Sequence, residues 1–171
     1  MKTLVEILFA GLITVTVINP VSAQSKKAIN EAKKTAEIKE LIDAKDYTFQ
    51  ASYMYPSGGG QRYLTSAYAL TVAPDTVEAY LPYWGVAYSN AGYNNSEDSG
   101  IKFKSTKFDY TTNAKKDGSH VIYIKTNDTR NVTQMTLQVY NNGNADLTVI
   151  STNTQQIRFT GYLQERKKPK A

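Results

Sequence analysis

Residues 81–88 read Leu-Pro-Tyr-Trp-Gly-Val-Ala-Tyr and hold the single tryptophan of the chain. Pro82 has no backbone N–H to donate, so a strand that enters this segment must end there or lie at a sheet edge. Gly85 permits a bend or a close approach of the backbone. We therefore expect residues 81–88 to be the fixed point of the fold, with approaching strands before it and further hairpins after it.

The N-terminus has the three-part layout of a secretory signal peptide. Lys2 precedes an uncharged, mostly apolar run at residues 7–18, and Pro20 precedes Val-Ser-Ala at residues 21–23. The run is shorter than the ~20 apolar residues of a membrane span. We expect cleavage after Ala23, against the alternative of a buried N-terminal helix. Without a cysteine near the cut a lipid anchor is excluded, so the mature protein is predicted to be free in the periplasm or secreted.

Composition excludes several classes of function. The 171-residue chain has no cysteine, so the fold must be stable without disulfides, and thiol catalysis and cysteine metal sites are excluded. The net charge of +5 is divided between a +2 segment at residues 24–45 and a +3 tail at residues 165–171, while residues 46–164 sum to zero. Basic ends on a neutral body argue against a nucleic-acid groove.

The rest of the chain predicts one helix followed by an antiparallel sheet. Residues 26–44 are rich in Ala, Lys and Glu and carry a thin apolar stripe, so residues 24–45 are predicted to form an N-terminal helix or tether whose second half docks on the sheet. Residues 46–164 then show period-two alternation in eight or nine short segments separated by turn residues. This spacing indicates an antiparallel barrel or, alternatively, a sandwich. The segment 47–55 is expected to place Tyr47, Phe49, Ala51, Tyr53 and Tyr55 on one face.

The long segment from Pro82 to Gly100 contains the candidate binding residues. It shows no strand or helix pattern, and such loops are often functional. Its rings carry polar groups that suit either a core plug at the barrel end or a binding surface. The candidate ligand-binding residues are Tyr83, Trp84, Tyr88 and Tyr93. Glu97 and Asp98 lack the spacing of a calcium loop, so no metal site is predicted.

No catalytic arrangement is evident. His120 is the single histidine, and we interpret it as a strand residue on a solvent face. Glu78, Asp109 and Asp146 lie in predicted strands, but the spacing brings no pair together for acid–base work. We expect a protein without catalytic residues or cofactors, and a carboxylate hydrolase remains an alternative.

Four pieces of the chain resemble a known family over residues 47–163. They are residues 64–68 (Leu-Thr-Ser-Ala-Tyr), 81–88, 100–103 (Gly-Ile-Lys-Phe) and 153–161. The family is domain of unknown function family 4251, secreted proteins typical of Gram-negative gut anaerobes. Residues 81–88 are similar to its Leu-Pro-Tyr-Phe-Gly-Arg-Ala-Tyr signature, with Trp84 and Val86 as departures, so no role of that arginine carries over. The resemblance implies a periplasmic, lipocalin-like barrel and brings no activity.

Two functional hypotheses follow from these patterns. The first is a non-enzymatic barrel that binds a small or extended ligand near the Pro82–Tyr93 loop. The second is a protein-interaction module, such as an inhibitor or an envelope-complex subunit, that uses the same rings as surface anchors. The exposure of Trp84 distinguishes a surface anchor from a core plug.

Overall fold

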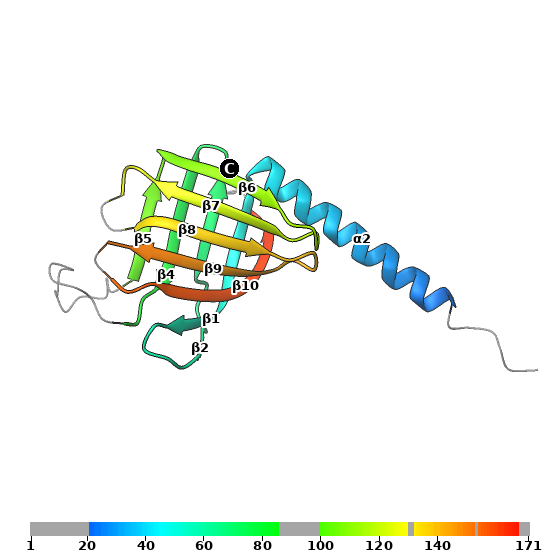
Figure 1. The fold of residues 1–171 in the computed structure, drawn as a ribbon, viewed down its shortest axis with the longest axis horizontal. Helices are drawn as coiled ribbons and strands as arrows, with labels where there is room; N and C mark the ends of the chain where they lie inside the picture. The colour runs from blue at the N-terminus through cyan, green and yellow to red at the C-terminus, as the bar shows by residue number, and fades with distance from the viewer. Residues whose placement is uncertain (1–20, 86–99, 130–131, 153, 168–171) are drawn as a thin grey trace, which may run out of the picture. The chain divides into compact units, whose positions relative to one another are not determined.

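The structure is a computed structural model that describes residues 21–85, 100–129, 132–152 and 154–167. These residues form one helix and a ten-stranded antiparallel sheet (Figure 1). In chain order the elements are α2 (Val21–Ala44), β1 (Tyr47–Pro56), β2 (Arg62–Tyr63), β3 (Ala69–Ala73), β4 (Thr76–Pro82), β5 (Gly100–Ser105), β6 (Phe108–Ala114), β7 (His120–Thr126), β8 (Val132–Val139), β9 (Asn144–Ser151) and β10 (Ile157–Glu165). The predicted class, mainly β with an N-terminal helix, is confirmed.

Nine of the strands follow one another around a nearly closed barrel. The order is β5-β4-β3-β1-β10-β9-β8-β7-β6, and β2 pairs with β1 beside this path. The first and last strands in sequence, β1 and β10, lie side by side in the middle of this order and pair along their whole length (Figure 1). In the described part of the chain no backbone pairing joins β5 to β6, although these strands are consecutive in sequence. A single curved sheet confirms the barrel and excludes the two-sheet sandwich.

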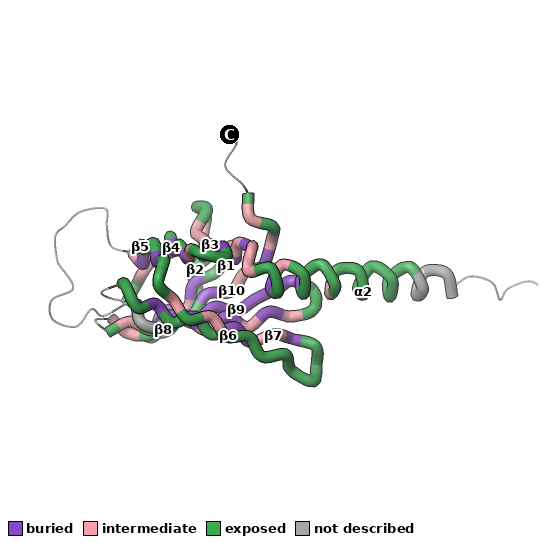
Figure 2. Tube along the Cα trace, turned by 90° about the horizontal axis from the view of Figure 1, so that it is seen from above, coloured by how far each residue is buried: buried purple, intermediate pink, exposed green. Residues whose placement is uncertain are grey.

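Alternating side chains fill the barrel. Along β4 the residues Val77, Ala79 and Leu81 are buried while those between them face outward, as the period-two pattern predicts. The same alternation recurs in β8, β9 and β10, and Figure 2 shows buried positions along the strands. The inward side chains form one contiguous hydrophobic cluster that includes Phe49 and Phe159, both fully buried. The fold is therefore stabilised by apolar burial, which suits a chain without disulfides.

The second half of α2 docks on the barrel, as predicted. Ile38 and Ile42 are buried in the core cluster and Leu41 packs against it, whereas Ile29 in the first half is 63% exposed. The helix ends in a Schellman motif: the Lys45 N–H donates to the carbonyl of Ile42 at 3.2 Å, and the next residue's N–H to that of Leu41 at 3.2 Å. Lys45 takes a positive φ of 51°, a conformation usually left to glycine.

A pair of tyrosines ties this helix end to the sheet. The hydroxyls of Tyr47 in β1 and Tyr110 in β6 lie 3.2 Å apart, and the Tyr110 hydroxyl donates to the Ile42 carbonyl at 3.4 Å. Burial raises the pKa of the Tyr47 hydroxyl well above its usual value and also raises the pKa of Tyr110. Both phenols therefore stay protonated at neutral pH and act as hydrogen-bond donors inside the fold.

The turn between β5 and β6 is held by one carboxylate. Asp128, in the loop after β7, accepts hydrogen bonds from the Thr106 N–H at 2.9 Å and the Lys107 N–H at 3.1 Å, and also from the buried Ser105 hydroxyl. The Ser105 hydrogen bond, followed by that of Thr106, lowers the pKa of Asp128. These contacts hold the end of β5 and the start of β6 near the loop after β7, although no backbone pairing joins β5 to β6 among the described residues.

The predicted face of β1 is wrong after Ala51. Ala51 pairs with Gly161 and Tyr53 pairs with Thr160, so Ser52 is an extra residue in a β-bulge. The bulge turns Tyr53 outward and Met54 into the core, against the expected alternation. Gly161 makes the bulge possible, because a Cβ there would lie 1.9 Å from the Gln50 carbonyl oxygen.

Two further element boundaries differ from the sequence prediction. Tyr68, Leu70 and Val72 share one phase, which predicts a single strand over residues 63–73, but β2 ends at Tyr63 and β3 begins at Ala69, with an irregular segment between them. The helix begins at Val21, so the predicted cleavage after Ala23 falls in its first turn, and residues 1–20 lie outside the described part. Within the described residues, α2 lacks the apolar length that a membrane crossing requires.

Candidate functional site

The segment that follows β4 places its two described rings differently. Tyr83 is half-buried and packs against the core cluster, whereas Trp84 is 58% exposed. The interpretation of this segment as a core plug therefore holds for Tyr83 and is wrong for Trp84. Tyr88 and Tyr93 lie outside the described residues, as do Glu97 and Asp98 of the rejected calcium loop.

Gly85 fixes the orientation of the half-buried ring. A Cβ at Gly85 would lie 2.7 Å from the Tyr83 hydroxyl oxygen and 3.1 Å from Cζ of the same ring. Any larger residue would push the Tyr83 ring away from its place against the core. Gly85 therefore lies directly against the Tyr83 ring, which leaves no room for a side chain at position 85 unless the ring shifts.

Exposed aromatic side chains gather around the short strand β2. The Arg62 guanidinium carbon lies 3.9 Å from the centroid of the Trp84 ring, a cation–π stacking distance. Tyr63, which is 67% exposed, meets Tyr53 of β1 edge-to-face with ring centroids 5.3 Å apart. We call Tyr53, Arg62, Tyr63 and Trp84 the β2 cluster. The β1 bulge creates part of it, because it turns Tyr53 outward to face Tyr63.

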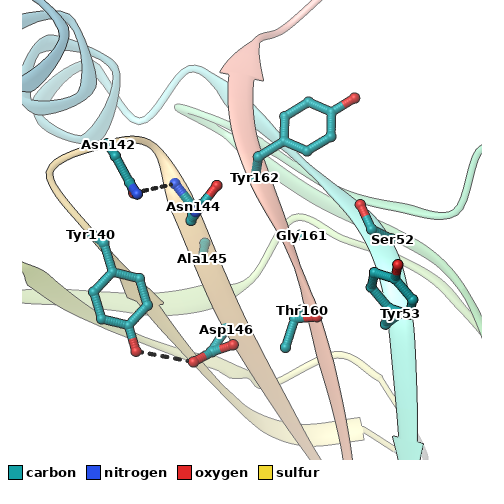
Figure 3. A pocket seen from close by; sticks show the side chains of 10 residues that line it. All are labelled: Ser52, Tyr53, Tyr140, Asn142, Asn144, Ala145, Asp146, Thr160, Gly161 and Tyr162. Carbon is teal, nitrogen blue, oxygen red and sulfur yellow. Dashed lines mark hydrogen bonds between the residues drawn. The ribbon is translucent and has the colours of Figure 1, made fainter. Parts of the chain in front are cut away.

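A groove of about 410 Å³ lies next to the β2 cluster on the outer face of β1, β10 and β9 (Figure 3). Its lining residues are Ser52, Tyr53, Tyr140, Asn142, Asn144, Ala145, Asp146, Thr160, Gly161 and Tyr162. The Tyr53 and Tyr162 rings border it on the side of β1 and β10, and Tyr140 borders it on the side of the β8–β9 turn (Figure 3). The groove is open to solvent, and Tyr53 is shared with the β2 cluster.

One hydrogen bond organises the polar side of the groove. The Tyr140 hydroxyl donates to Oδ2 of Asp146 at 3.0 Å, and this bond raises the pKa of Tyr140. At the turn, the Asn144 N–H donates to the side-chain oxygen of Asn142 at 3.0 Å. These bonds hold the carboxylate and one amide in place without filling the groove.

The structure brings no catalytic set together among the described residues. Glu78, Asp109 and Asp146 lie on β4, β6 and β9, none of which are neighbours in the sheet. His120 is half-buried at the start of β7, and the adjacent Ser119 donates its hydroxyl to Asp117 at 2.7 Å. No group of three metal-ligating side chains occurs in the described ranges.

Comparison with known proteins identifies the family. Residues 30–163 match the family described as Domain of unknown function (DUF4251). The chain belongs to this family. The DUF4251 domain is similar to the crystal structure of a DUF4251 family protein from Bacteroides eggerthii DSM 20697, solved at 1.95 Å resolution. The TM-score is 0.58 at 17% sequence identity, over 78% of this chain and 89% of that chain. No curated protein matches the chain.

The family match and the structural likeness support the fold of the DUF4251 domain, and neither assigns it an activity. Sequence reasoning named Trp84 and Tyr83 but missed Arg62, Tyr63 and the whole groove. Tyr63 is an aromatic residue in a mostly polar segment, which is a weak sign of an exposed ring. The strand that carries it, β2, has only two residues and therefore shows no periodicity in the sequence. The groove depends on the β1 bulge, which the alternation of residues 47–55 conceals.

Proposed function

We propose that this DUF4251 domain is a non-enzymatic binding module of the periplasm or the extracellular space, and that Trp84 anchors a protein partner. The observation that carries the proposal is the exposed indole stacked under Arg62. Tryptophan, tyrosine and arginine are the residues that dominate the energy of protein interfaces. All three types meet in the β2 cluster, where the Arg62 guanidinium stacks on one face of the Trp84 ring.

The partner surface implied by this chemistry has two parts. An apolar or aromatic side chain would cover the free face of the Trp84 ring. A carboxylate or backbone carbonyl would accept the guanidinium N–H donors of Arg62 at its edge. The barrel interior is a poorer candidate for a ligand site, because inward side chains such as Phe49 and Phe159 fill the described part of it.

A small or extended ligand held beside the Pro82–Tyr93 loop is the second candidate. The observation in its favour is the contrast between adjacent rings: Tyr83 packs on the core and Trp84 stands at the rim. Such a ligand would contact the indole without the broad surface that a protein covers. Secretion is part of both candidates, and N-terminal sequencing of the exported protein would test the predicted cut after Ala23.

The experiment places a photo-crosslinking amino acid at Tyr63, which is 67% exposed in the β2 cluster, and, as a control, at Tyr123, which is 41% exposed on β7. A protein adduct formed from position 63 and not from position 123 is expected. Affinity for the purified partner should then fall about 30-fold or more in Trp84→Ala, as for an interface hot spot. Tyr123→Ala should leave the affinity unchanged. Equal adducts at both positions, or undiminished affinity in Trp84→Ala, would refute the proposal.

A further inference from the structure

The outer groove beside β10 has a composition that points to one class of ligand. Its lining combines three tyrosine rings with hydroxyl, amide and carboxylate groups, and it includes no cationic side chain. Its volume of about 410 Å³ lies within the range of small-molecule sites. Because it is open, a chain of repeating units could pass through it and extend beyond both ends.

The rings supply the apolar part of such a site. Tyr162 and Tyr53 border the groove from neighbouring strands, and Tyr140 stands opposite (Figure 3). Aromatic rings with hydroxyl groups suit ligands that are apolar on one side and wet on the other. The C–H faces of a pyranose ring have this character, because all of the hydroxyls of the sugar project around its edge.

The polar groups match the edge of the same ligand. Asp146 accepts the Tyr140 hydrogen bond through Oδ2 alone, which leaves Oδ1 as an acceptor facing the groove side of β9. Thr160 adds a hydroxyl from β10 and Asn144 adds an amide from the start of β9. Planar amides and carboxylates can bind two adjacent hydroxyls at once, since each offers two polar atoms in one plane.

The charge of the groove disfavours acidic ligands. Asp146 is the one charged residue among its lining side chains, and the cation that acts on the lining, Arg158, affects Tyr140 without lining the groove, so phosphate groups, acidic peptides and acidic sugars would bind less well than neutral ligands. From the rings, the adjacent hydrogen-bonding groups and this charge, we infer that the groove binds a neutral oligosaccharide. This site goes beyond the proposed protein-binding surface at Trp84, with which it shares only Tyr53.

The shape of the groove depends on the bulge in β1. Gly161 brings β10 so close to the Gln50 carbonyl that no side chain fits between them. The floor there is made of small residues, Gly161 and Ala145, with Thr160 beside them. A floor of small residues with rings at its borders leaves room for a sugar ring to lie against tyrosine, whereas a side chain at position 161 would separate the strands that form the floor.

The test uses the full mature domain on an array of neutral oligosaccharides of glucose, galactose, mannose and N-acetylglucosamine, with uronic-acid and sialylated oligosaccharides as the acidic set. Binding to members of the neutral set is expected, followed by titration of a soluble hit. Tyr162→Ala and Asp146→Asn should each weaken binding about tenfold or more. Tyr123→Ala, at an exposed tyrosine outside the groove, should leave it within about twofold of the parent.

The outcomes separate this inference from the proposed protein-binding function. Trp84→Ala should leave saccharide affinity unchanged, since Trp84 does not line the groove. Unaltered melting temperatures for Tyr162→Ala and Asp146→Asn, both at solvent-facing positions, establish that the variants are folded. The inference is overturned if no neutral oligosaccharide binds at millimolar concentration, if only the acidic set binds, or if neither groove variant weakens binding.

Discussion

The substitution Gly161→Ala tests the close approach of β1 and β10. An added Cβ would lie 1.9 Å from the Gln50 carbonyl oxygen, 2.9 Å from the Gln50 carbonyl carbon and 3.1 Å from Cα of Ala51. The obstacle is backbone, so no side-chain rotation can relieve it. A normal carbon–oxygen contact is about 3.3 Å, which requires the two strands to separate by roughly 1.4 Å at this point.

This separation has a cost that can be worked out from the ladder. Paired strands lie about 4.8 Å apart, so a displacement of this size disrupts the hydrogen bonds around the Ala51–Gly161 pair. Losing two such bonds costs about 2 kcal/mol, and the overpacking adds about 2 kcal/mol. We expect the free energy of unfolding to fall by about 4 kcal/mol, which lowers the melting temperature by about 10–15 °C.

Differential scanning calorimetry of the mature domain measures the effect. Gly58→Ala is the matched control, because nothing lies within 4 Å of a Cβ there and its φ is outside the left-handed region. That variant should unfold within about 0.5 kcal/mol of the parent. If Gly161→Ala melts within about 2 °C of the parent, the bulge and the groove floor built on it are wrong.

Two further substitutions test how the barrel is held at its ends. Tyr47→Phe should lower the free energy of unfolding by about 1 kcal/mol at neutral pH through loss of the Tyr110 hydrogen bond. Because the pKa of Tyr47 is raised in the folded state, the parent keeps this stability below pH 10.0, the usual pKa of tyrosine. Above that pH the free energy of unfolding falls by up to about 1.4 kcal/mol per pH unit. Chemical denaturation of Tyr47→Phe should therefore show a smaller loss of stability at alkaline pH. Asp128→Asn should speed amide hydrogen exchange at Thr106 and Lys107. Because the pKa of Asp128 is lowered, its contribution is present above its usual pKa of 3.8 and lost as pH falls through the folded value, so the variant should be less acid-sensitive. If stability falls as steeply with alkaline pH in Tyr47→Phe as in the parent, the role of Tyr47 is wrong. If amide exchange at Thr106 and Lys107 is unchanged in Asp128→Asn, the role of Asp128 is wrong.

The regular part of the fold could be predicted because burial alternates wherever one strand face meets the core. Val77, Ala79 and Leu81 of β4 show this alternation. Hairpin turns are also a local feature of the sequence, because Gly118 and Gly143 take the positive φ that such turns require. The resemblance to the DUF4251 family added the barrel shape, which alternation alone leaves open.

The irregular part could not be predicted because its causes are long-range. The β1 bulge is fixed by Gly161, more than one hundred residues away, while the local pattern of β1 continues as if uninterrupted. The helix end has Lys45 in a conformation that favours glycine, and its ammonium stacks 5.0 Å from the Tyr110 ring in β6. The stacking of Arg62 on Trp84 likewise joins two residues that are far apart in sequence, so no local pattern announces it.

The fluorescence of the single tryptophan reports directly on the surface proposed to bind a partner. Trp84 lies under Arg62 with its side chain at the surface, 58% exposed. The folded domain should therefore show the red-shifted emission of a hydrated indole, strong quenching by acrylamide, and a further gain in quenching in Arg62→Ala. A blue-shifted emission that resists acrylamide would mean that Trp84 is a core residue and would contradict the proposed binding surface.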